Sequence, residues 1–279
     1  MPTASNNTLA RQKGTAIDGK ELGIRAAWNE PAWRQKGDMS EPSEYSESGN
    51  PIYRHEPSDK PLDFAMGNQE NIDAISGHIE RHLGQSPTVF HEIVSHLVHI
   101  DVHFVAASAE RPYHTLITSG MSDRPMTAPE GAEEFRYAEL MMCLPPEWPL
   151  TEDAFKEDRW FWPIKTLKFL ARMPHEYDTW LCLGHTIPNG DPLELFTGTP
   201  FCCALIAPPQ LVPEEFFELK MAEDKVVHFF AVVPIFQEEM DLKLNKGADE
   251  LWERFDKHKV SELLDIKRVN TAKKRFGIF

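Results

Sequence analysis

The chain has 279 residues, of which 41% are hydrophobic, and it carries a net charge of −15 at pH 7. This length suits one large domain or two small ones with a buried core. The negative charge repels phosphate backbones and argues against direct nucleic-acid binding. No run of about 18 apolar residues could form a membrane-spanning helix, and the N-terminus lacks the apolar region of a secretory signal. We therefore expect a cytoplasmic protein whose acidic surface serves solubility or attracts a basic protein partner.

Composition divides the chain into three parts. Residues 1–66 are rich in Ser, Pro, Glu and Gly, which bury little apolar area, so we predict a flexible N-terminal segment there. Within it, Trp28 and Trp33 either dock on the main domain or a partner, or belong to an unstructured leader. Residues 67–267 form the predicted main domain, and residues 268–279 form a predicted loose basic C-terminal tail.

The main domain begins with a predicted amphipathic helix over residues 68–84, where apolar residues recur at helical spacing and a glycine ends the pattern. Two later stretches are also helical, residues 151–174 and residues 237–260. Pro163 would give two segments or one kinked helix in the first, and Gly247 breaks the second.

Apolar patterns typical of strands lie between the helices. They cover residues 96–108, 113–122, 135–145, 180–190, 200–209, 216–221 and 225–236. The connections between neighbouring strands are often too short for parallel crossovers. The fold class that we predict is α+β, or mixed α/β, with a largely antiparallel central sheet and helices packed on it.

The motif HIDVHF raises the question of a metal centre. In a strand, His99, Asp101 and His103 would share one face while Ile100, Val102 and Phe104 face the core. The outer histidines would be about 13 Å apart, so all three side chains would not easily converge on one ion.

A metal-dependent enzyme that uses this face would need a third ligand from elsewhere, and His114 on the next predicted strand is available. The alternative, which we prefer, is a polar sheet face without an ion.

Other catalytic motifs fail on spacing. His91 and His96 are five residues apart in HEIVSH, whereas a zinc-protease helix needs histidines four apart. Ser119 and Ser122 lie in TSGMSD, which does not match the GxSxG nucleophile motif. Phosphate-binding glycine motifs are absent, and no cofactor is implied. The four cysteines form no CxxC pair, and we expect them to be buried and reduced.

The stretch GHTIPNGDP predicts a tight turn after a strand, because proline, asparagine and glycine favour turn conformations. Its functional interpretation is a rigid loop that presents His185 and Asn189.

Several stretches occur together in a characteristic order: HIDVHFV, YHTLITSGMSDRPM, EFRYAELMMCLPPEWP, WPIKTLKFLARMPHEYDTWLCLGHTIPN and FFAVVPIFQEEMDLKL. As a set, over about residues 70–265, they resemble the suppressor of fused (SUFU) domain family in its bacterial form. The resemblance implies a mixed α/β fold without a known enzymatic activity. It also implies binding of a protein partner: animal members sequester a transcription factor of the hedgehog pathway through a short extended peptide, and bacterial relatives are thought to include immunity proteins against toxins.

The resemblance also suggests where a partner would bind. The peptide-facing positions would be Arg172, Met173, Asp178, Gly184 and His185, to which the turn adds Asn189. Animal members carry a second, C-terminal domain for which this chain ends too early, and they place an acidic residue where this chain has His185. The animal peptide is therefore not expected to bind here.

Taken together, the sequence predicts a non-enzymatic protein-binding domain that acts as an immunity protein or antitoxin toward a toxin or other protein, with a basic toxin domain as the expected partner. Two alternatives stay open. One is the metal-dependent enzyme built on His99, Asp101 and His103, and the other is a regulatory scaffold that sequesters a protein without a toxin target.

Overall fold

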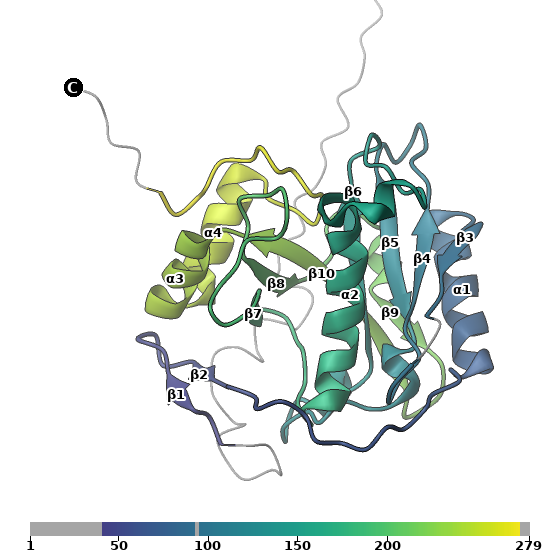
Figure 1. Ribbon diagram of the computed structural model, residues 1–279, viewed down its shortest axis with the longest axis horizontal. Helices are drawn as coiled ribbons and strands as arrows, with labels where there is room; N and C mark the ends of the chain where they lie inside the picture. Colours follow the sequence, from purple (N-terminus) through teal and green to yellow (C-terminus); the bar gives the residue numbers. More distant parts are fainter. Residues whose placement is uncertain (1–40, 93–94, 274–279) are drawn as a thin grey trace, which may run out of the picture.

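The computed structural model describes residues 41–92 and 95–273 (Figure 1). Its helices are α1 (Gln69–Leu83), α2 (Asp158–Glu176), α3 (Gln237–Lys246) and α4 (Ala248–His258). Its strands are β1 (Glu44–Tyr45), β2 (Pro51–Ile52), β3 (Thr88–Phe90), β4 (Asp101–Val105), β5 (His114–Ser119), β6 (Ala138–Leu144), β7 (Thr186–Pro188), β8 (Cys203–Ala207), β9 (Glu218–Lys220) and β10 (Val226–Ile235). No helix of the described part is both long and apolar enough to cross a bilayer.

One sheet of eight strands dominates the fold, in the order β3-β4-β5-β6-β10-β8-β7, with β9 paired to β10. Every pairing in this sheet is antiparallel except that of β6 with β10, which is parallel. The parallel pair arises because α2 carries the chain from β6 to the far edge, and the chain then returns through β7 and β8 to β10. The predicted α+β fold with a largely antiparallel sheet is therefore confirmed.

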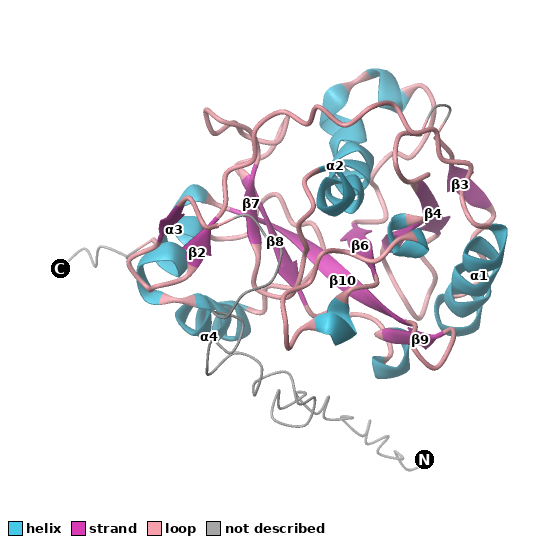
Figure 2. Ribbon diagram, turned by 90° about the horizontal axis from the view of Figure 1, so that it is seen from below, coloured by secondary structure: helices cyan, strands magenta, loops and turns pink. Residues whose placement is uncertain are grey.

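Helices cover both faces of the sheet. Figure 2 shows α2 on one side of β6 and β10, and α4 on the other. Along β6, Leu140 and Met142 belong to the core beneath α2, whereas Met141 and Cys143 belong to the opposite core, which includes α1 and α4. Because both faces are buried, the central strands β6, β8 and β10 are mostly apolar and do not alternate regularly with polar residues.

The long predicted helix over residues 151–174 is divided before Asp158, not at its proline. A short 3-10 turn covers Ala154–Lys156, and α2 then continues unbroken through Pro163. The ring of Pro163 is buried, so packing compensates for the main-chain hydrogen bond that it cannot donate. The predicted break near Gly247 is present, with φ of +94° at that residue.

Both predicted flanking segments contain ordered contacts. Residues 41–66, from the predicted flexible N-terminal segment, form the β1–β2 hairpin and then cross beneath the C-terminal end of α2 to reach α1 (Figure 1). Trp28 and Trp33 lie outside the described residues. In the predicted C-terminal tail, Arg268 pairs with the buried Glu239 at 2.6 Å. The boundaries at residues 67 and 268 stay predictions, but ordered structure continues past both.

Candidate functional site

The TSGMSD turn after β5 is held by a single buried carboxylate on β6. Glu139 is fully buried and accepts four hydrogen bonds. Thr118 donates its hydroxyl to Oε2 at 2.6 Å, Gly120 donates its N–H to Oε1 at 3.0 Å, and Ser122 donates both its N–H (3.0 Å) and its hydroxyl (2.7 Å) to Oε1. The hydroxyl of Ser122 is thus engaged and buried, so this turn is a structural element of the core.

Two further contacts lock the same turn. Gly120 has φ of +106°, and a Cβ at this position would overlap the carbonyl oxygen of His99. The Nε2–H of His175 on α2 donates to the carbonyl oxygen of Met121 at 2.9 Å. Burial lowers the pKa of His175 to about 4, so its ring is neutral near pH 7. Sequence reasoning did not single out Glu139, although a lone carboxylate within an otherwise apolar strand was a usable signal.

In the structure, His99 and Asp101 of the predicted His-Asp-His face lie together, but His103 lies apart from them. β4 begins at Asp101, and the Nε2 atom of His99 lies 3.1 Å from its Oδ1. The third residue near this carboxylate is His91, whose Nδ1 lies 2.9 Å from Oδ2. In the described residues, His91, His99 and Asp101 are the one group of three or more metal-type side chains whose ligand atoms lie within 4.8 Å of one another.

His103 and His114 do not join this group, which corrects the ligand set considered from the sequence. His103 is buried, and its Nε2 contacts the Ser119 hydroxyl on β5 at 2.9 Å. His114 donates from Nε2 to the carbonyl oxygen of Pro146 at 3.0 Å. Alternation keeps His103 on the same face of β4 as Asp101, but about 6.6 Å farther along the strand. There its ring contacts Ser119 and does not reach the group around Asp101.

Of the predicted partner-binding residues, the two on α2 make internal contacts. The Nη2 of Arg172 donates to both carboxylate oxygens of Glu92, at 2.5 and 2.6 Å. The Nε of Arg172 donates to the carbonyl oxygen of His96. Met173 is buried in the core beneath α2. Arg172 therefore positions the loop after β3, and Met173 contributes to the core.

Asp178 is different, because 71% of its side chain is exposed just after α2 ends. Its backbone is left-handed, with φ of +48°. Residues 53–66, which we call the crossing segment, reach it through Lys60, whose Nζ lies 2.7 Å from both Asp178 Oδ1 and the carbonyl oxygen of His175. His55 stacks on Tyr177 with ring centres 4.9 Å apart. The crossing segment thus lies against the region to which the resemblance assigns partner binding.

The remaining predicted residues flank β7. Gly184 donates its N–H to Ile206 at 2.7 Å, and Asn189 donates its N–H to Cys202 at 2.8 Å, so both join the β8 ladder. His185 accepts the N–H of Cys182 at its Nδ1. Burial, followed by the charge of Lys243, lowers the pKa of His185 to about 4. His185 is thus a neutral structural residue near pH 7.

β7 is an end strand of the described sheet. His185 and Asn189, the residues on either side of β7, direct their backbone groups toward β8. The carbonyl oxygen of His185 and the N–H of Asn189 are both hydrogen-bonded there. Thr186 and Pro188 therefore direct their backbone groups away from β8. Proline has no N–H, so this edge offers Thr186 as its donor and two carbonyl oxygens as acceptors. The arrangement can accept a short extended segment and contains no catalytic group.

Comparison with known proteins agrees with this architecture. The sequence model described as "Suppressor of fused protein (SUFU)" matches residues 96–269. A SUFU homologue from Neisseria gonorrhoeae is 20% identical, with a TM-score of 0.54 over 74% of this chain and 100% of that one. The Sufu–Fu complex contains a chain that is 15% identical, with a TM-score of 0.50 over 72% of this chain and 92% of that one.

No curated protein matches the chain. The two structural likenesses show a shared fold, and the sequence match covers more than half of the 279 residues. The chain belongs to the suppressor of fused (SUFU) family.

Proposed function

We propose that this chain binds and holds a protein partner, as an immunity protein that neutralises a toxin, and catalyses no reaction. One structural relative is known in complex with a protein, Fu, and partner binding is extended from it to this chain. The observation that carries the proposal is the position of β7 at the edge of the described sheet, because strand addition to a sheet edge supplies main-chain hydrogen bonds to an extended peptide. The net charge of −15 favours a basic partner through electrostatic steering.

Asp178 supports the same surface. Its exposed carboxylate carries one negative charge beside the C-terminal end of α2, and only Lys60 of the crossing segment contacts it among the described residues. A basic partner would compete with Lys60 for this carboxylate. The crossing segment therefore tunes access to the surface that a partner would use.

The proposal is tested with a toxin domain encoded beside this gene, co-expressed with the chain. Rescue of growth supports an immunity role. The purified pair then gives a dissociation constant, and the association rate should fall markedly between about 0.05 and 0.5 M salt because the Debye length shrinks. Binding without rescue of growth favours a regulatory scaffold, and an association rate indifferent to salt removes the acidic surface from the mechanism.

A matched pair of variants locates the surface. Asp178→Asn removes the charge but keeps a residue that tolerates left-handed backbone, and it should weaken binding roughly three- to tenfold. Asp153→Asn is the control, since Asp153 is also exposed (90%) and also lies 2.7 Å from a lysine, Lys156. Lys60→Ala should tighten binding because it frees Asp178. Equal effects of the two aspartate variants would place the partner elsewhere.

A further inference from the structure

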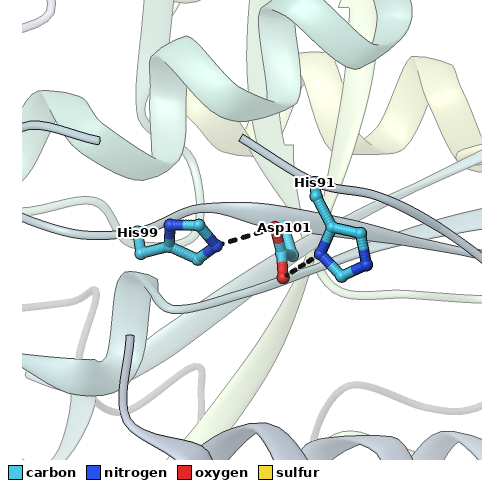
Figure 3. Close-up of side chains that lie close together, drawn as sticks. All are labelled: His91, His99 and Asp101. Carbon is cyan, nitrogen blue, oxygen red and sulfur yellow. Dashed lines mark hydrogen bonds and ion pairs between the residues drawn. The ribbon is translucent and has the colours of Figure 1, made fainter. Parts of the chain in front are cut away.

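Three side chains meet at one point near the edge formed by β3 (Figure 3). His91 follows β3, His99 precedes β4, and Asp101 is the first residue of β4. The His91 Nδ1 atom lies 2.9 Å from Asp101 Oδ2, and the His99 Nε2 atom lies 3.1 Å from Oδ1. Figure 3 shows the carboxylate between the two rings, with one ring nitrogen facing each of its oxygens.

The geometry is close to that of a metal site. Two imidazole nitrogens and a carboxylate are a common donor set for zinc and related divalent ions. Ligands of a tetrahedral zinc ion lie about 3.3 Å apart when each bond is about 2.0–2.1 Å. The largest separation in the cluster is at most 4.8 Å, so closure onto an ion needs a small movement. His91 can supply that movement, because 68% of its side chain is exposed.

The surrounding groups hold the other two ligands. The Asp101 side chain is only 4% exposed, and its Oδ1 accepts the N–H of Glu92 at 3.2 Å. The His99 side chain is 19% exposed, and its Nδ1 lies 2.6 Å from the hydroxyl oxygen of Ser95. Contacts of this kind, to the atoms of a ligand that face away from the ion, are typical of metal sites.

The same contacts permit a change of tautomer. Without metal, each histidine donates a proton from the nitrogen that faces Asp101. With metal, those nitrogens must be unprotonated. His91 can carry its proton on Nε2 in solvent, and His99 can carry its proton on Nδ1, because the Ser95 hydroxyl can accept as well as donate. In each state the nitrogen of His99 that faces away from Asp101 keeps its contact with the Ser95 hydroxyl.

Two carboxylates, Glu92 and Asp101, and two cations, Arg172 and Lys168, lie at or near the cluster. Arg172 is already paired with Glu92 in a two-pronged contact. Lys168 on α2 feels the charges of Glu92 and Asp101, while burial lowers its pKa. A divalent ion would be repelled by Lys168, so the removal of this charge should tighten binding rather than weaken it.

We propose that His91, His99 and Asp101 bind one divalent transition-metal ion, for which zinc is the probe, with water in the fourth position. The ion would join the end of β3 to the start of β4. This inference does not depend on the proposed partner binding, and the ligand set differs from that considered from the sequence, because His91 takes the place of His103.

The test is calorimetric titration of the full metal-free chain with zinc chloride, followed by cobalt(II) absorption spectroscopy. The wild type should bind one zinc ion per chain with micromolar affinity or tighter. His91→Ala should weaken binding at least tenfold and abolish the cobalt absorption bands of a tetrahedral site. This variant should fold, since the side chain is mostly exposed.

Two comparisons make the result specific. His258→Ala changes an exposed histidine outside the cluster and should leave the affinity unchanged, and Lys168→Gln should tighten it several-fold. Absence of saturable zinc binding by the wild type, or an equal loss in His91→Ala and His258→Ala, would overturn the proposal. So would loss of binding in His103→Asn with none in His91→Ala, because it would restore the ligand set expected from the strand pattern.

Discussion

Two buried carboxylates flank β5, and they differ in the groups that surround them. Glu139 on β6 accepts hydrogen bonds from hydroxyls and main-chain N–H groups of the TSGMSD turn. Asp101 on β4 accepts mainly from two histidines, one of them mostly exposed. The donors of Glu139 have no alternative role, whereas those of Asp101 can lose a proton and become ligands.

The difference teaches how to separate a structural carboxylate from a binding one. Burial and a full set of partners are common to both, so neither property decides. The two kinds of carboxylate are distinguished by the chemistry of their hydrogen-bond donors and by the exposure of those donors to solvent. On this criterion Glu139 organises the core, and Asp101 is the anchor of a site.

The largest expected effect tests how tightly the turn beside Glu139 is closed. Gly120→Ala should destabilise the protein by about 4 kcal/mol or more, because the new Cβ would overlap the carbonyl oxygen of His99 and the backbone is left-handed. Gly131→Ala is the control: φ there is +86°, but nothing lies within 4 Å of the added Cβ, and about 1 kcal/mol is expected. Urea unfolding measures both, and similar losses would mean that the close approach is not present.

The next effect compares the carboxylates directly. Glu139→Ala leaves four buried donors without their acceptor and should cost about 3–4 kcal/mol in the free energy of unfolding. Asp101→Ala should cost about 1–2 kcal/mol, because the exposed His91 can turn to water. The same urea titrations give both values. An equal or larger cost for Asp101 would make it the structural member of the pair.

Acid should lower the free energy of unfolding through His175, which contacts the TSGMSD turn at Met121. Its pKa is lowered to about 4, mainly by burial, so the folded state favours the neutral ring. The stability that this provides is fully present above about pH 6.5 and is lost as the pH falls toward about 4, by up to about 3 kcal/mol. His175→Gln keeps a donor for Met121 and should flatten the dependence of the thermal midpoint on pH in this range. An unchanged slope would show that other groups cause the loss.

The smallest effect concerns an exposed carboxylate. Lys60→Ala removes the contact with Asp178, and it should change the free energy of unfolding by less than about 1 kcal/mol, because 71% of that aspartate is in water. Thermal unfolding at low and high salt measures it. A loss comparable with that of Glu139→Ala would mean that the crossing segment is part of the core and not a cover over it.

Much of the fold could be predicted from the residues alone. Helical spacing at Ile75, Ile79 and Leu83 identified α1, and apolar runs identified the central strands. Such patterns reflect which positions of an element are buried, and they extend over the whole element. The continuation of α2 through Pro163 could not be predicted, because it depends on core contacts that compensate for a missing hydrogen bond.

The candidate sites were less predictable. The alternation of His99, Asp101 and His103 was visible, but His91 enters from a loop, and a loop carries no periodic signal. The six predicted partner-binding residues could be placed along the chain, but the groups that each of them contacts could not be predicted. Arg172 proved to hold Glu92, and Asp178 proved to face Lys60 from 118 positions earlier.

The sequence by itself determined the fold class, the order of the elements, the acidic balance and the family resemblance, since each is carried by local pattern and composition. Only the tertiary structure decided which polar side chains meet. Some of these contacts join residues far apart in the chain, such as Lys60 and Asp178. Others depend on the path of a loop, which places His91 on Asp101, while His103 contacts Ser119 instead.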